Sequence, residues 1–74
     1  MKIPSNMSEE SVIKVMNKVI DKTAGKYTFY GYSIDDIKQE SYIICIEALE
    51  RYDEKRPLEN FLSSNLSNRL KNFI

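Results

Sequence analysis

The side chains of this 74-residue chain that could do chemistry are carboxylates, amides and hydroxyls, because histidine is absent and Cys45 is the one cysteine. Without histidine the chain lacks the usual general base near neutral pH, and one cysteine cannot build a zinc site of the Cys/His kind. The adjacent carboxylates Asp35 and Asp36, or Glu9 and Glu10, diverge by about 100° on a helix and do not converge on one reacting atom. We therefore expect no catalytic residue, no metal, no cofactor and no enzyme activity.

Acidic side chains surround an apolar centre on one face of the segment 33–52. Intervals of three and four residues place seven positions on one side of a helix, namely Asp36, Gln39, Glu40, Ile43, Ile46, Glu47 and Glu50. Such a face could dock a basic partner helix, with Ile43 and Ile46 as anchors and the carboxylates as a steering rim. The alternative is a solvated acidic face beside core isoleucines.

A second polar face follows Pro57 and differs in kind, since uncharged hydrogen-bonding side chains dominate it. Its members are Asn60, Ser63, Ser64, Ser67, Asn68, Lys71 and Asn72. Amides and hydroxyls reach base edges and phosphates, while Arg56, Arg69 and Lys71 supply attraction for a nucleic acid. The alternative is an ordinary polar surface, although serine and asparagine are poor helix formers.

Three helices must position these faces, and we predict an all-α fold, a small three-helix bundle. The spacing of apolar residues predicts helices over about 8–24, 33–52 and 57–73. A chain of this length forms a single domain over residues 1–74 with a thin core. The expected capping and end residues are Asn6 or Ser8 and Gly25 for the first helix, Ser33 with Asp36 for the second, and Pro57 at the first position of the third.

The second predicted helix has an unusually wide apolar set, which predicts packing on more than one side. Cys45 lies within it between Ile44 and Ile46, which indicates a buried, reduced thiol in a cytoplasmic protein. No window approaches the roughly 18 to 20 apolar residues needed to span a bilayer, so we expect no membrane partner.

The net charge of zero is a cancellation between segments. Residues 1–34 carry a balance of +2, residues 35–54 a balance of −5 and residues 55–74 a balance of +3. The middle of the chain is thus acidic and its end basic. Between the first two helices lie four aromatic residues that could stack on unpaired bases or pack down to close the core, namely Tyr27, Phe29, Tyr30 and Tyr32.

The order of the residues adds two motifs. Asp-Asp-Ile-Lys-Gln-Glu at 35–40 is followed by Ala-Leu-Glu-Arg-Tyr-Asp at 48–53, and Leu-Glu-Asn-Phe-Leu at 58–62 is followed by Asn-Arg-Leu at 68–70. This order resembles region 2 of the sigma-70 family of bacterial RNA polymerase specificity factors. Together with Phe-Tyr-Gly-Tyr-Ser at 29–33, it is most similar to the late-transcription sigma factors of tailed bacteriophages of the myophage type.

The resemblance implies a transcription initiation factor that binds RNA polymerase core and promoter DNA. It places seven residues against the clamp helices of the beta-prime subunit, namely Asp36, Gln39, Glu40, Tyr42, Ile43, Ile46 and Glu47. It places Tyr52, Arg56 and Phe61 around a flipped base of a −10-like promoter element. The implied promoter-facing helix carries Ser64, Asn65, Asn68, Arg69 and Lys71. Flipping a base costs a few kcal/mol, so the protein alone should bind DNA poorly.

The chain departs from the family pattern in two ways. Primary factors carry adjacent aromatics that wedge the duplex open where Ser64 and Asn65 stand here. The chain also ends on the apolar Ile74, so we expect a trimmed domain whose missing tail binds a phage coactivator and a sliding clamp. The alternative function is a small helical interaction module, or a sigma mimic that inhibits the host polymerase without binding DNA.

Overall fold

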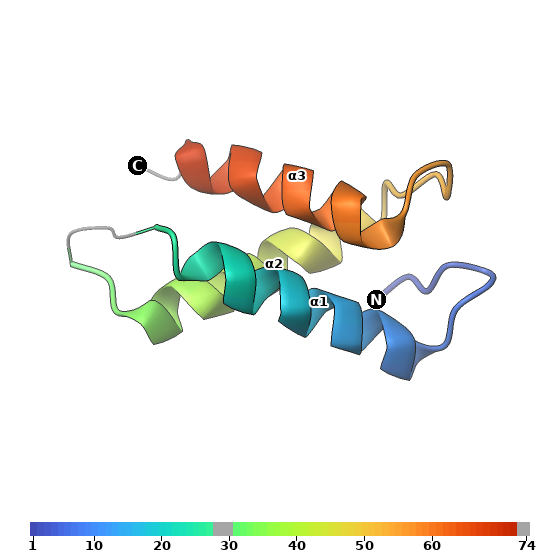
Figure 1. Ribbon diagram of the computed structural model, residues 1–74, viewed down its shortest axis with the longest axis horizontal. Coiled ribbons are helices and arrows are strands. Elements are labelled where there is room, and N and C mark those ends of the chain that lie inside the picture. The colour runs from blue at the N-terminus through green and yellow to red at the C-terminus, as the bar shows by residue number, and fades with distance from the viewer. Residues whose placement is uncertain (28–30, 73–74) are drawn as a thin grey trace.

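The computed structural model describes residues 1–27 and 31–72, which form three α-helices. They are α1 (Glu9–Ala24), α2 (Ile34–Leu49) and α3 (Leu58–Lys71). Each helix packs against the other two, with α2 antiparallel to both α1 and α3 (Figure 1). The prediction of an all-α three-helix bundle is confirmed. Among the described residues, no helix has the length and apolar character required to cross a bilayer.

Side-chain caps fix the starts of the first two helices. The Ser8 hydroxyl accepts a hydrogen bond from the backbone N–H of Ser11 at 3.1 Å, so Ser8 rather than Asn6 is the cap of α1. At α2 the Ser33 hydroxyl accepts from the N–H of Asp36, and the Asp36 carboxylate accepts from the N–H of Ser33. This reciprocal pair is the predicted capping box.

Two helix boundaries differ from the prediction. α2 ends at Leu49 rather than Tyr52. The backbone N–H groups of Arg51 and Tyr52 donate to the carbonyls three residues before them, as in a 3₁₀ turn, and not to those four residues before them as in an α-helix. α3 begins at Leu58, so Pro57 precedes the helix instead of occupying its first position. The predicted end of α3 at residue 73 lies outside the described residues.

The two glycines act differently. Gly25 ends α1 as predicted, but its φ of −67° is one that any residue adopts, so this helix end does not depend on glycine. Gly31 has a φ of +85°, in the region that side chains with a Cβ rarely occupy. A residue with a Cβ would therefore be strained at position 31.

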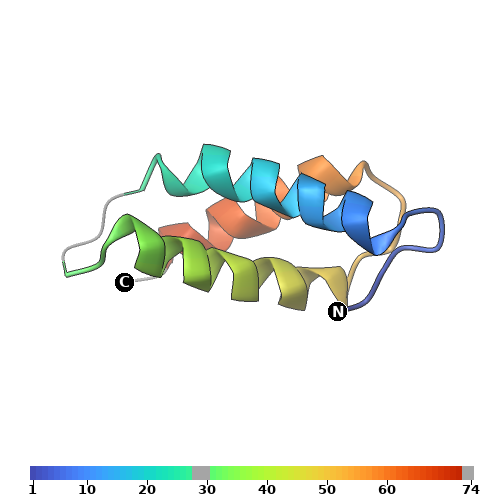
Figure 2. The same cartoon turned by 90° about the horizontal axis from the view of Figure 1, so that it is seen from below.

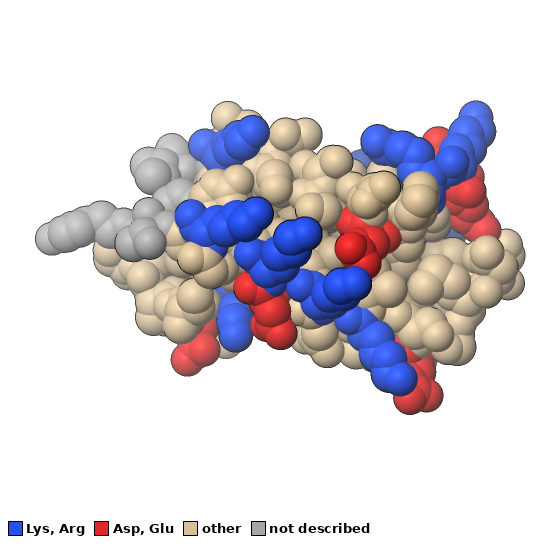
Figure 3. All heavy atoms as spheres, viewed as in Figure 1, with Lys and Arg blue, Asp and Glu red and all other residues tan. Residues whose placement is uncertain are grey.

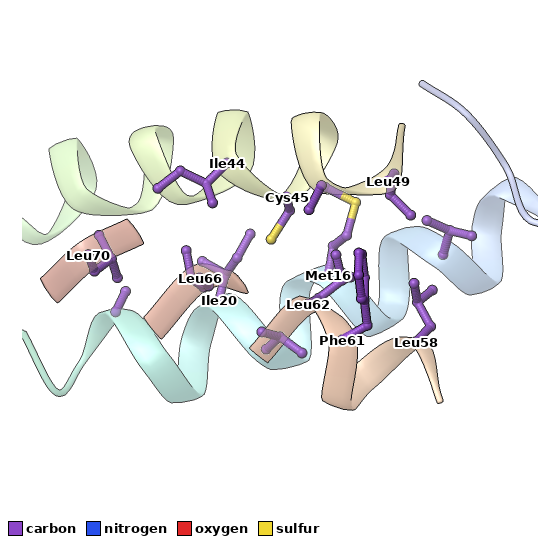
Figure 4. Close-up of a cluster of buried hydrophobic side chains, with 14 of the residues drawn as sticks. Met16, Ile20, Ile44, Cys45, Leu49, Leu58, Phe61, Leu62, Leu66 and Leu70 are labelled. Atoms are coloured by element: carbon purple, nitrogen blue, oxygen red, sulfur yellow. The ribbon is translucent and has the colours of Figure 1, made fainter. Parts of the chain in front are cut away.

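The core lies along the bundle axis, where all three helices contribute apolar side chains (Figure 4). Met16 and Ile20 of α1 meet Cys45 and Leu49 of α2 there, and Leu62 of α3 is fully buried. Cys45 is free and 1% exposed, and this burial raises the pKa of its thiol to about 11. The prediction of a buried thiol is confirmed.

The outward side of α2 is the main departure from the expected packing. Ile34, Ile43 and Ile46 are 50%, 51% and 39% exposed, whereas Ile37 and Ile44 are buried. α2 packs against both α1 and α3, but its buried residues form one stripe along the helix, so only part of the wide apolar set is buried. The remaining isoleucines face solvent.

Candidate functional site

The first candidate surface is the α2 outer face, which we define by the seven residues expected to contact the polymerase. They are Asp36, Gln39, Glu40, Tyr42, Ile43, Ile46 and Glu47, all exposed except the half-buried Glu40. The fold brings all seven together on one helix. Tyr42, Ile43 and Ile46 form its apolar centre, and contiguous exposed apolar surface with a polar rim is typical of a binding site.

The carboxylates of the α2 outer face have different surroundings. Asp36 is committed to the capping box, and Glu47 pairs with Arg69 of α3 at 3.3 Å. Glu40 has no cation within ion-pair distance among the residues that the structure describes. Glu40 is therefore the carboxylate of this face that can accept a partner's cation without losing an internal contact.

Contacts with α1 hold one edge of the α2 outer face. The Tyr42 hydroxyl donates a hydrogen bond to the Asn17 amide oxygen. One helical turn earlier, the Lys38 ammonium pairs with the Asp21 carboxylate at 3.5 Å. Both contacts join residues 17 to 25 positions apart, so they arise from the antiparallel packing of α1 and α2.

The three residues expected around a flipped base form a cluster where the α2–α3 connection meets α3. The Tyr52 and Phe61 ring centroids lie 4.9 Å apart, and the Arg56 guanidinium lies 5.2 Å from the centroid of Phe61. The Tyr52 hydroxyl also donates to the Arg56 carbonyl. Phe61 is only 7% exposed, and no cavity opens among the described residues. A base could stack on Phe61 only after displacing Arg56 or Tyr52.

The second candidate surface is the α3 polar face, which we define as Asn60, Ser64, Ser67, Asn68 and Lys71. All are exposed except the half-buried Ser67. No large apolar side chain of the described part of α3 is exposed. This surface offers hydrogen-bond donors and acceptors with one cation, which suits phosphates and base edges better than an apolar partner.

Asn65 and Arg69, two of the residues expected on the promoter-facing helix, bond instead to groups within the protein. The Asn65 amide nitrogen donates to the Phe61 carbonyl at 2.9 Å, and its oxygen accepts from Arg51 at 3.3 Å. Arg69 reaches Glu47 of the α2 outer face. The Glu47–Arg69 ion pair therefore forms a junction between the α2 outer face and α3. Sequence reasoning missed this junction because no local pattern links residues 22 positions apart.

Lysines of α1 lie on the side of the bundle that carries α3. The net charges of the three sequence segments do not predict this position. Figure 3 shows basic side chains in a band across the face where α1 lies in front, beside α3. The Lys18 ammonium pairs with Glu59 of α3 at 3.1 Å, and Lys14 pairs with Glu10 at 3.8 Å. Because each of these two cations faces a carboxylate, they add little net positive charge beside the α3 polar face.

The aromatic segment between α1 and α2 is described in part. Tyr27 is half-buried and packs against the core, as expected of a residue that closes the bundle. Tyr32 is 50% exposed. Phe29 and Tyr30 lie outside the described residues.

The remaining chemistry of the described residues is limited, since no group of three or more potential metal ligands gathers there. No protein-family model, curated protein or solved structure matches the chain. The proposed function therefore rests on the exposed surfaces of the protein.

Proposed function

We propose that this chain is a transcription initiation specificity factor of the sigma region 2 type. It docks on the clamp helices of the beta-prime subunit of RNA polymerase core and engages a −10-like promoter element, without catalysis of its own. It acts in the cytoplasm of a bacterium or of a phage-infected bacterial cell during late transcription. The observation that carries the proposal is the exposure of Ile43 and Ile46 inside an acidic rim, on the helix that bears the sigma-like motif.

The α2 outer face suits a basic helix with an apolar stripe. Removing the exposed part of Ile43 or Ile46 from water contributes about 1 kcal/mol each. The carboxylates around them raise the rate of encounter with a positively charged partner and disfavour acidic ones. Apolar anchors thus supply affinity, and the rim supplies selectivity.

The α3 polar face suits a nucleic acid held by another protein. Its amides and hydroxyls can bond to bases and phosphates, but Lys71 is its one cation, so attraction for free DNA is weak. Polymerase binding would hold promoter DNA against this face and make up the missing affinity. Lys18 and Lys14 of α1 would have to leave their ion pairs with Glu59 and Glu10 to reach a phosphate.

Run-off transcription tests the proposal. The complete chain is added to RNA polymerase core on a template with an extended −10-like element, and the expected result is a discrete transcript that core alone does not make. Asn68→Ala should lower the amount of transcript while leaving core binding unchanged. Equal loss of both would mean that the α3 polar face is structural.

A second candidate function is favoured by the contacts that Arg69 and Arg56 make within the protein. Arg69 is paired with Glu47 and Arg56 lies over Phe61, so two of the expected DNA contacts are engaged within the protein. A sigma mimic that binds polymerase and inhibits it needs no DNA contact. In the same assay a mimic would initiate no transcription itself, and with the host factor added it would reduce transcription by that factor.

A further inference from the structure

Residues 3–7, which precede α1, fold back onto the end of the bundle where α2 leads into α3. Pro4 is buried, and Ile3 and Met7 are half-buried against the core. The backbone N–H of Met7 donates to the Pro4 carbonyl at 3.1 Å, which closes a turn. Figure 2 shows the segment before α1 and the connection between α2 and α3 at the same end of the bundle. Residues 3–7, here called the strap, lie outside the two sigma-like motifs.

A hydrogen bond joins the strap to the connection between α2 and α3. The Ser5 hydroxyl donates to the Glu54 carboxylate at 2.8 Å, although the two residues are 49 positions apart. Glu54 has a φ of 63°, in a region that residues with a Cβ rarely adopt. Such a conformation persists where the surrounding contacts hold it. The strap supplies one of these contacts, and the Lys55 N–H, which donates to the Asp53 carboxylate at 3.0 Å, supplies another.

The turn at Glu54 determines where Arg56 lies. Two residues beyond Glu54, the Arg56 guanidinium lies over the Phe61 ring at 5.2 Å from its centroid, and the Arg56 carbonyl accepts from the Tyr52 hydroxyl. Phe61 belongs to the core, whereas Arg56 is exposed and lies outside the helices. Arg56 can therefore move away together with the connection while the three helices stay in place, and this movement would expose the ring face that it covers.

We propose that the strap holds Arg56 as a lid over Phe61, and that release of this lid lets an unpaired base stack on the ring. The inference rests on the proposed function, in which promoter DNA supplies the base, and it adds control of that site by residues ahead of α1. Stacking of a base on an aromatic ring is stronger than a cation–π contact at an exposed site, so a base can displace Arg56. The bond between Ser5 and Glu54 opposes this exchange, because only molecules with an open lid bind the base.

NMR on the complete chain tests the lid without DNA. The ring current of Phe61 shifts the δ-methylene resonances of Arg56 upfield while the guanidinium covers the ring. Ser5→Ala removes the donor of the bond and Glu54→Ala removes the acceptor, so both should reduce this upfield shift. Glu54→Gln is the matched control, because its amide oxygen can still accept from Ser5, and it should retain the shift. Circular dichroism checks that all three variants keep their helices.

Fluorescence anisotropy with a short single-stranded DNA at low salt tests what the open lid admits. Ser5→Ala should raise the affinity about threefold, because loss of one exposed hydrogen bond increases the open fraction by about this factor. Glu54→Ala should show the same gain relative to Glu54→Gln, since both variants lose the charge and only the first loses the bond. An abasic oligonucleotide of the same length is the control probe, and Ser5→Ala should leave its affinity unchanged.

The outcomes separate this inference from the proposed function. If Ser5→Ala leaves the Arg56 shift unchanged, or frees Arg56 without raising the affinity for the single-stranded DNA, the strap proposal is wrong. An equal gain for the abasic oligonucleotide would also overturn it, since the effect would then belong to the phosphates. A chain that gives no run-off transcript, yet binds bases more tightly with Ser5→Ala, would overturn the proposed function and support the strap.

Discussion

The α2 outer face and the α3 polar face are both solvent-exposed sides of amphipathic helices in one bundle, yet they are built differently. The first presents Tyr42, Ile43 and Ile46 to water within an acidic rim. The second presents amides and hydroxyls, and the described part of α3 exposes no large apolar side chain. An exposed isoleucine adds little to the stability of the fold, and a contiguous group of such side chains is the kind of surface that a partner could bury.

The difference also separates two ways of binding. An apolar centre gives affinity by leaving water, whereas a polar face gives specificity when something else holds the ligand in place. The Glu47–Arg69 ion pair links the α2 outer face to a residue of α3 that was expected to contact DNA but lies outside the α3 polar face. A partner that binds Glu47 would therefore free Arg69.

The largest expected effect contrasts a buried aromatic of α3 with an exposed isoleucine of α2. Phe61→Ala should lower the free energy of unfolding by about 3 to 5 kcal/mol, because it leaves a cavity in the core and removes the ring that Tyr52 and Arg56 pack against. Ile43→Ala should change it by less than about 0.5 kcal/mol. Urea unfolding measures both, and similar losses would mean that the α2 outer face is part of the core.

The next largest expected effect is a pH dependence of stability caused by Cys45 on the buried side of α2. Burial raises the pKa of the Cys45 thiol from 9.0 to about 11, so the folded state holds this proton more tightly than the unfolded state. The protonated thiol therefore contributes about 3 kcal/mol to the free energy of unfolding. This contribution is complete below pH 9 and is lost as the pH rises through 11. Urea unfolding of the unmodified chain and of Cys45→Ala from pH 8 to pH 11 measures it. A stability difference between them that does not change with pH would contradict the burial of the thiol.

Charge reversal on the α2 outer face should have an intermediate effect, on binding instead of stability. Glu40→Lys should weaken association with RNA polymerase core at least tenfold and leave the helical content intact, because it places a cation against a basic partner. Asp36→Lys should do the same but also cost about 1 kcal/mol of stability, since Asp36 closes the capping box. Glu54→Lys, in the α2–α3 connection, is the control with the same change of charge. Pull-down with core polymerase that retains Glu40→Lys would refute the assignment of this face.

The smallest expected effect lies at the junction between the α2 outer face and α3. Glu47→Gln should raise the affinity for a short single-stranded promoter DNA by about two- to fivefold, because it frees Arg69 from its ion pair. Glu50→Gln removes the same charge from the end of α2 without breaking a pair, and its effect should be smaller. Fluorescence anisotropy at low salt measures both, and equal gains would show that only the net charge matters.

Much of the fold follows from the sequence because its signals are local. Ser33 and Asp36 are three residues apart and specify a capping box, and the spacing of apolar residues specifies each helix. The same spacing cannot distinguish the side of α2 that faces α1 and α3 from the side that faces solvent, since isoleucines occur on both. Ile43 and Ile44 are neighbours in the chain, and only the packing of the other helices makes one exposed and the other buried.

The residues of the candidate surfaces can likewise be predicted where they share one helix, but their contacts with other helices cannot. Periodicity groups six of the seven residues of the α2 outer face, because they share one helix, whereas Tyr42 was expected there only from the resemblance. Periodicity does not predict the ion pair of Arg69 with Glu47 or the position of the α1 lysines beside α3. Each of these depends on the register between helices, which residues distant in the chain determine together.

The central claim is that RNA polymerase core covers the α2 outer face and not the opposite end of the helix. Methyl cross-saturation NMR on the complete chain, with isoleucine methyl groups labelled, measures which isoleucines touch the polymerase. We expect the strongest saturation at Ile43 and Ile46 and none above background at Ile34, although all three are exposed. Saturation at Ile34 equal to that at Ile43, or none at Ile43 and Ile46 in a complex that forms, would contradict the claim.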